Sequence, residues 1–288
     1  MNSNVEVENC TFVNNTAMSG GAISVECNYL IPCTNVIRDS VFTNNVAIEE
    51  GGGIIYNTYQ PELINNTYGD NIAELGNDVA SYATRIKKVS NGTLVDLNEL
   101  NDVPSGIVID EDMVFAVVSA EQNSIMTSNS RSVIKWETID ENTRVRGQNT
   151  VTLNKGMVTF SDTIFEAAPG MQDVKFRLAS SAIDYNVLQY LDPVKYADQI
   201  ISVNFRWCKP GEIQDGNTCL KCNSGSYSVT WNSTRCLSCP DNASCEEERI
   251  SLSAGYWRIS RNSTDIMECP NEEACLGGYN ATSQYPVN

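Results

Sequence analysis

The chain of 288 residues contains no histidine. Histidine is the side chain that most readily gains or loses a proton near neutral pH. Its absence excludes a Ser-His-Asp or Cys-His nucleophile pair and any metal site that needs an imidazole. It leaves carboxylate catalysis possible, because two acidic groups suffice to cleave a glycosidic bond. Acidic residues on a strongly negative chain are usually only solvated, so we expect no enzyme, no catalytic residue and no cofactor.

Basic residues are also scarce. There are 19 lysines and arginines against 36 acidic residues, and the net charge is −17. Such a chain lacks the basic patch that nucleic acid or an anionic membrane surface requires, so neither is expected as a partner.

Long apolar runs are missing as well. None reaches the ~18 residues of a membrane span. The opening residues, Asn2-Ser3-Asn4-Val5, contain no apolar core of a signal peptide. We therefore expect the sequence to be part of a longer exported chain, with any membrane anchor outside it.

Cysteine is absent between residues 34 and 207 but crowded elsewhere. Cys10, Cys27 and Cys33 precede this gap, and eight cysteines follow it: Cys208, Cys219, Cys222, Cys236, Cys239, Cys245, Cys269 and Cys275. This density predicts a disulfide scaffold in an oxidising compartment. A four-cysteine zinc site and redox chemistry are the alternatives. We expect disulfides at these eight cysteines and at Cys27 and Cys33, with no metal, and leave the pairing of Cys10 open.

Glycosylation signals agree with this compartment. Asn-x-Ser/Thr sequons occur at Asn9, Asn14, Asn65, Asn91, Asn232, Asn242, Asn262 and Asn280. Some of them arise by chance in an Asn-rich chain. Together with the cysteines, they predict an extracellular or cell-surface protein that passes through the secretory pathway and carries N-linked glycans.

A repeat opens the chain. Residues 10–17 recur as residues 40–47, which places Phe12 and Phe42 30 residues apart, and a weaker third copy covers residues 68–73. A glycine follows each copy, and Asn-Asn pairs suit corners because asparagine tolerates left-handed backbone. A period of this length indicates stacked repeats. We predict coils of a right-handed parallel β-helix over residues 1–88, with Phe12 and Phe42 stacked inside.

The middle of the chain follows a period of two. We predict strands over 114–119, 133–138, 174–178 and 200–207, and a hairpin that joins 150–153 to 157–160 through Asn154-Lys155-Gly156. These strands predict a β-sandwich spacer over residues 89–207, similar to the immunoglobulin-like spacers of adhesins. The acidic stretch from Asp96 to Asp112 is expected to be solvated, with calcium binding as the alternative.

The last part, residues 208–288, is predicted to be a small disulfide-rich module. We expect Trp231, Tyr256 and Trp257 to form its small core, and the binding of sugar or protein by these aromatics is the alternative. The fold class is thus mostly β, with three domains in series.

Two parts of this chain resemble known families. The Phe-x-Asn-Asn-x-Ala pattern followed by glycines is similar to the repeat of chlamydial polymorphic outer-membrane proteins and of large surface proteins of ciliates and other protists. The Cys-x-x-Cys, Gly-x-Tyr and Cys-x-x-Cys-Pro order resembles the growth-factor-receptor and ephrin-receptor-like modules of protist surface proteins. Nearest-neighbour order and that resemblance imply four disulfides: Cys208–Cys219, Cys222–Cys236, Cys239–Cys245 and Cys269–Cys275.

These patterns favour a structural or adhesive extracellular region, a surface rod or filament component that self-associates or binds other surface proteins. A ligand-binding receptor ectodomain is the alternative, and an enzyme acting on glycans is the third candidate.

Overall fold

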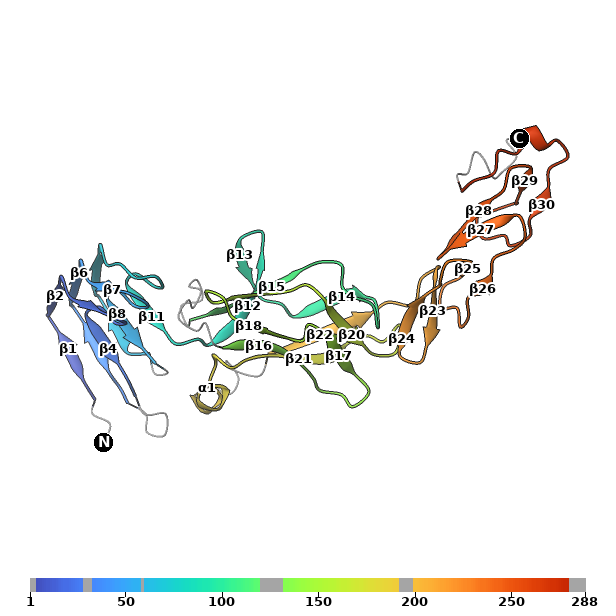
Figure 1. The fold of residues 1–288 in the computed structure, drawn as a ribbon. Helices are drawn as coiled ribbons and strands as arrows, with labels where there is room; N and C mark the ends of the chain where they lie inside the picture. Colours follow the sequence, from blue (N-terminus) through green and yellow to red (C-terminus); the bar gives the residue numbers. More distant parts are fainter. Residues whose placement is uncertain (1–3, 28–32, 58–59, 120–131, 192–198, 280–288) are drawn as a thin grey trace.

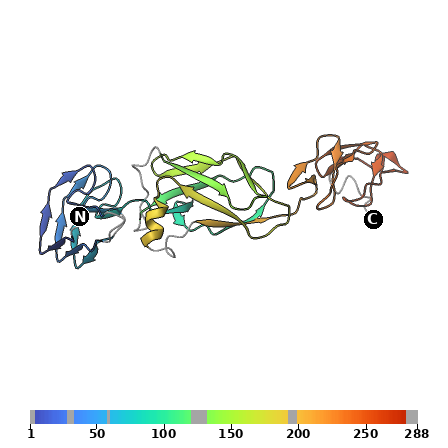
Figure 2. The ribbon, with the colours of Figure 1, turned by 90° about the horizontal axis from the view of Figure 1, so that it is seen from below.

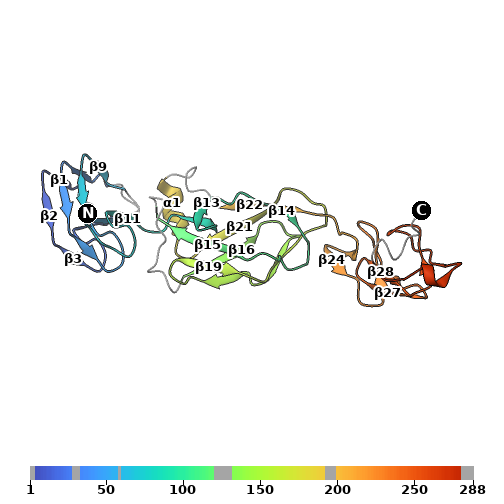
Figure 3. The same cartoon turned by 90° about the horizontal axis from the view of Figure 1, so that it is seen from above.

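The computed structural model describes residues 4–27, 33–57, 60–119, 132–191 and 199–279. Its described part is mostly β, with one α-helix, α1 (Tyr185–Leu191), and one 3-10 helix, η1 (Glu272–Ala274). Three regions follow one another in a row in Figures 1, 2 and 3. We name them the repeat region (residues 4–81), the middle region (85–205) and the C-terminal region (208–279).

Three units of short strands build the repeat region. The first holds β1 (Glu6–Glu8), β2 (Thr11–Val13), β3 (Thr16–Ala17) and β4 (Ile23–Val25); the second holds β5 (Val36–Arg38), β6 (Val41–Thr43), β7 (Val46–Ala47) and β8 (Ile54–Tyr56); the third holds β9 (Glu62–Ile64), β10 (Thr67–Gly69) and β11 (Val79–Ser81). Corresponding strands pair in parallel as β1-β5-β9, β2-β6-β10, β4-β8-β11 and β3-β7. The expected stacking of parallel repeats is confirmed.

Two ladders run through the interior of these units. The rings of Phe12 and Phe42 stack with centroids 4.9 Å apart, and Tyr68 continues the stack at 5.5 Å. Beside them, the side-chain amide of Asn15 donates to Asn45 Oδ1 at 2.8 Å, and that of Asn45 donates to Asn71 Oδ1 at 2.9 Å. Side chains in one column lie about 4.8 Å apart in stacked strands, so like residues touch. The predicted inward stacking of Phe12 on Phe42 is confirmed.

The corners use residues that accept positive φ. Asn14 and Asn44 have φ of 56°, as the Asn-Asn pairs predict, and Asp70 takes this place in the third unit. Gly20, Gly51 and Gly76 also have positive φ. A second corner, formed by Asn9, Asp39 and Asn65, was not predicted.

Two β-sheets form most of the middle region. One has the order β13-β12-β15-β19 and the other β14-β22-β21-β16-β18. The strands of the first are β12 (Arg85–Ser90), β13 (Thr93–Val95), β15 (Met113–Val118) and β19 (Met157–Phe160). Those of the second are β14 (Glu99–Val103), β16 (Val133–Thr138), β18 (Thr150–Thr152), β21 (Val174–Ser180) and β22 (Ile200–Phe205), and β17 (Arg144–Gly147) pairs with β20 (Thr163–Glu166). The four predicted strands are all present.

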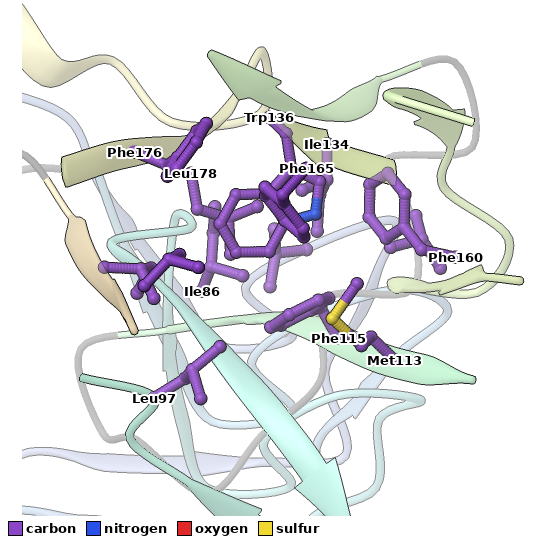
Figure 4. Packing of buried hydrophobic residues seen from close by; sticks show 14 of the residues in the cluster. Ile86, Leu97, Met113, Phe115, Ile134, Trp136, Phe160, Phe165, Phe176 and Leu178 are labelled. Atoms are coloured by element: carbon purple, nitrogen blue, oxygen red, sulfur yellow. The ribbon is translucent and has the colours of Figure 1, made fainter. Parts of the chain in front are cut away.

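An aromatic core fills the space between the two sheets (Figure 4). Trp136 packs edge-on against Phe165 at 5.1 Å and against Phe115 at 5.8 Å. Phe115 lies on the first sheet and Trp136 on the second, so these contacts hold the sheets together. Edge-to-face pairs are favoured by the aromatic quadrupole.

The predicted hairpin at 150–160 is wrong in its pairing. Lys155 and Gly156 form the turn with positive φ, and Asn154 bridges Met157. However, β18 pairs with β16 in one sheet and β19 with β15 in the other. The turn therefore carries the chain from sheet to sheet, which sequence alternation alone cannot distinguish from a hairpin, since both need the same turn residues.

Eight short strands form the C-terminal region: β23 (Glu212–Asp215), β24 (Thr218–Lys221), β25 (Ser226–Tyr227), β26 (Leu237–Ser238), β27 (Ala243–Glu246), β28 (Arg249–Leu252), β29 (Tyr256–Trp257) and β30 (Met267–Glu268). The β25–β26 pair recurs 30 residues later as β29–β30. Gly225 donates to the carbonyl of Cys245, and Gly255 donates likewise to Cys275. This second repeat was missed in the sequence.

The small core of this region is not the predicted one. Tyr227, Cys245, Ile250 and Leu252 form it. Trp231 is 64% exposed, and Tyr256 and Trp257 are only half-buried. Disulfides hold the hairpins close, so one aromatic ring and a few medium-sized side chains fill the space, and the three predicted aromatics lie at least partly outside it.

Candidate interaction site

Ten of the eleven cysteines are paired in disulfides, and Cys10 is free and exposed. The pairs are Cys27–Cys33, Cys208–Cys219, Cys222–Cys236, Cys239–Cys245 and Cys269–Cys275. The expected disulfide framework is therefore present.

The zinc alternative does not fit these pairs, because the four sulfurs it needs are already in S–S bonds. Cys208, Glu212 and Cys219 do lie within ligand distance of one another. Both of these cysteines are bonded to each other, however, and Glu212 accepts two hydrogen bonds from Arg206 at 2.7 and 2.8 Å.

The sequon asparagines lie mostly on exposed turns. Six are exposed: Asn9, Asn14, Asn65, Asn91, Asn242 and Asn262. Asn232 is half-buried, and Asn280 lies outside the described residues. Asn9 and Asn65 share one corner of the repeat region, with Asp39 between them. Glycan occupancy stays a prediction.

The acidic stretch before β15 offers no metal site in the described residues. Asp96, Asp110 and Asp112 are exposed, and Asp96 forms an ion pair with Lys87 at 3.4 Å. The candidate ligand cluster among the described residues lies elsewhere, at Cys208.

Negative charge is concentrated in the repeat region. Residues 1–84 hold ten acidic residues and a single basic one, Arg38. Arg38 is already engaged by Glu6 at 2.7 Å and Glu8 at 2.9 Å. More than half of the net charge of −17 therefore lies on less than a third of the chain.

An apolar stripe runs across the outer face of the same region. Met18, Ile48 and Ile72 are 58%, 60% and 60% exposed, and Val46 is half-buried. Val46 bridges Ile72 in the neighbouring unit. Alternate residues of a strand share a face, so Val46 and Ile48 both point outward and Ala47 points inward. We call Met18, Val46, Ile48 and Ile72 the apolar stripe.

A cavity of about 380 Å³ lies where the repeat region meets the middle region. We call it the junction cavity. Its lining includes Glu26, Glu49 and Glu50, the tyrosines Tyr56 and Tyr82, and Ala182 from the middle region. Burial raises the pKa of the Tyr82 hydroxyl, and the negative charges of Glu26 and Glu50 raise it further. The cavity is thus an environment that disfavours further negative charge.

A tighter junction joins the middle and C-terminal regions. Ser105 Oγ lies 2.7 Å from the carbonyl oxygen of Ala167 and 2.6 Å from that of Asn217. The backbone N–H of Cys219 donates to the Ser105 carbonyl at 2.8 Å. Nearby, the ring of Trp207 lies directly over Gly170, where a Cβ atom would collide with it. These contacts fix the two regions to each other.

Sequence reasoning missed the apolar stripe and the junction cavity. The stripe had a signal in the sequence, since at least one apolar residue follows the Asn-Asn or Asp-Asn corner at an outward position in each of the three units: Met18, Val46 and Ile48, and Ile72. The cavity had none, because its lining comes from residues 19–83 and from Ala182, which the fold alone brings together.

Residues 9–26 match the Chlamydia polymorphic membrane protein repeat. The match spans the first unit from the Asn9 corner through β4, so this segment is similar to that repeat. No curated protein and no solved structure matches the chain. In the described residues, no helix is both long and apolar enough to cross a membrane.

Proposed function

We propose that this chain is a structural and adhesive region of an extracellular or cell-surface glycoprotein, with no catalytic role. In this proposal the repeat region is the end of a right-handed parallel β-helix, followed by an immunoglobulin-like sandwich that acts as a spacer. The C-terminal region is a growth-factor-receptor-like module. The corresponding domains are residues 1–88, 89–207 and 208–288.

The observation that carries the proposal is the arrangement of the three regions in a row (Figure 1), together with the hydrogen bonds that join the second region to the third. The Ser105 and Arg206–Glu212 contacts stiffen that joint, because buried polar groups with several partners leave little freedom. A row of β regions with one stiff joint suits a rod that holds one end away from the other.

The extracellular assignment is supported by the five disulfides and by the match to a membrane-protein repeat. Disulfides persist in oxidising compartments. The exposed sequons fit the same compartment, because an oligosaccharide needs an accessible Asn.

The test is intact-mass analysis of the native glycoprotein before and after treatment with a glycosidase. Glycans on Asn242 and Asn262, with the cysteines oxidised in the stated pairs, are the expected result. Unmodified asparagines at both positions, or free thiols at the eight C-terminal cysteines, contradict the extracellular role.

A ligand-binding receptor ectodomain is the second candidate. The exposed indole of Trp231 favours it, because exposed tryptophans are enriched at the centres of binding interfaces. Saturable binding of a soluble ligand that Trp231→Ala abolishes, with the fold unchanged, would support this candidate over a purely structural role.

A further inference from the structure

We propose that the apolar stripe and the junction cavity form one docking surface for a partner protein segment that is both basic and apolar, with a lysine or arginine side chain entering the cavity. This inference deepens the proposed adhesive role and rests on it only for the assumption that the chain binds rather than reacts.

The two features are continuous along the chain. Met18 and Ile48 belong to the stripe, and the next residues, Ser19 and Glu49, line the cavity. Ser19 donates a hydrogen bond to Glu49 Oε2 at 3.3 Å, which joins the two units at the rim. A partner that covers Met18 and Ile48 therefore lies one residue along the chain from the rim of the cavity in both units.

Charge complementarity selects a basic partner. The residues that line the cavity include three glutamates and no lysine or arginine in the described part of the chain. Glu26 is exposed and Glu49 half-buried, so both remain accessible to an incoming cation. The surrounding repeat region has one arginine, and Glu6 and Glu8 already bind it. Opposite charges speed association and exclude partners of like charge.

The aromatic lining fits an organic cation better than a bare metal ion. Tyr82 is 48% exposed and is the accessible ring of the lining, whereas Tyr56 beside it is buried. Ring faces attract ammonium and guanidinium groups. The glutamates of the cavity do not converge closely enough to form a candidate metal cluster among the described residues.

The stripe supplies the apolar half of the contact. Three of its side chains, Met18, Ile48 and Ile72, are more than half exposed and come from three successive units of the repeat region. Contiguous exposed apolar side chains mark interaction surfaces. The stripe residues themselves complete no sequon: Thr16 completes the sequon of Asn14, but its counterparts Val46 and Ile72 in the next two units complete none.

The test uses the purified, disulfide-bonded chain and a short synthetic peptide of alternating leucine and lysine, with binding measured by calorimetry at physiological salt. Two site variants are made: Glu26→Gln with Glu49→Gln, and Ile48→Ser with Ile72→Ser. Each pair should weaken binding by roughly tenfold, since each removes one half of the contact.

Matched controls carry the same chemical changes elsewhere. Asp110→Asn with Glu111→Gln removes two exposed acids from the middle region, and Ile139→Ser with Ile259→Ser removes two exposed apolar side chains. These pairs should change the affinity less than twofold. A leucine–glutamate peptide should not bind, and a serine–lysine peptide should bind more weakly.

Four outcomes overturn the proposal: no saturable binding of the leucine–lysine peptide, an equal loss in control and site variants, binding of calcium alone that competes with the peptide, or self-association of the chain that the site variants abolish. Circular dichroism of each variant verifies its fold. Binding is measured after the chain is treated with a glycosidase, so a failure to bind the peptide is distinguishable from a failure of the extracellular role.

Discussion

The first two units of the repeat region lie 30 residues apart, and so do the two hairpins β25–β26 and β29–β30 of the C-terminal region, but different interactions hold the units of each region together. In the repeat region, parallel strands stack in register, and Phe42 and Asn45 touch their counterparts in the units on both sides. In the C-terminal region the units are antiparallel hairpins tied by disulfides. An equal period therefore does not imply an equal architecture.

The difference follows from what each unit can bury. A unit of the repeat region contributes an aromatic ring and several aliphatic side chains to a shared interior. A unit of the C-terminal region contributes few apolar side chains, so cross-links replace the missing burial. The second C-terminal unit shows the reverse replacement, of a disulfide by apolar side chains. Its residues at the positions of Cys222 and Cys236, 30 residues further on, are Leu252 and Ile266, and both pack in the core.

Reduction should have the largest effect, and it should unfold the C-terminal region while the middle region stays folded. Each disulfide is worth about 2–4 kcal/mol, so loss of four should unfold the C-terminal region. The middle region contains no cysteine and should stay folded around Trp136. Hydrogen exchange with mass spectrometry should show loss of protection in β23 to β30 and retained protection in β15 and β16. If a chelator unfolds the C-terminal region and a reductant does not, the cross-links are not its support.

Removal of one stacked ring tests the other half of the comparison. Phe42 is fully buried between Phe12 and Tyr68, so Phe42→Ala should cost about 3–5 kcal/mol in free energy of unfolding. Phe12 is only half-buried and has one ring neighbour, so Phe12→Ala should cost less. Thermal denaturation of the reduced and oxidised protein measures both. Equal costs at the two positions would show that stacking depth does not set stability.

The same physical difference decides how much of each region's structure could be predicted from the sequence. Parallel stacking copies each residue type into the next unit, so Phe12, Phe42 and the Asn-Asn pairs could be read directly as columns. The C-terminal core could not be predicted, because disulfides decide which side chains lie inside. The 150–160 turn and the junction cavity depend on contacts between distant segments, which a local pattern does not contain.

The asparagine ladder should contribute less than the rings. Asn45 is fully buried, donates to Asn71 Oδ1 and to the Phe12 carbonyl at 3.0 Å, and accepts from Asn15. Asn45→Ala leaves buried groups unpaired and should cost about 1–3 kcal/mol. Asn15→Ala, at an exposed ladder end, should cost clearly less. Chemical denaturation followed by circular dichroism compares them, and a larger loss at Asn15 would contradict the ladder account.

The smallest expected effect concerns the middle region, which has neither repeats nor cross-links and uses ion pairs on its outer sheet face. Burial acts to raise the pKa of Glu137, but the hydrogen bond and charge of Arg177, together with Lys135, outweigh it and hold this pKa below its usual value. A lowered pKa in the folded state means that the ion pair stabilises the fold fully above the ordinary glutamate pKa. That contribution disappears as the pH falls through the lowered value.

Glu137→Gln should therefore reduce stability near neutral pH by about 0.5 kcal/mol, a small amount because solvent screens this partly exposed pair. The difference between variant and parent should vanish in acid. Urea denaturation at neutral pH and near pH 3 measures it, with Glu111→Gln as an exposed control that should change nothing at either pH. A difference that grows as the pH falls has the wrong sign for a lowered pKa, and it would remove Arg177 as the cause.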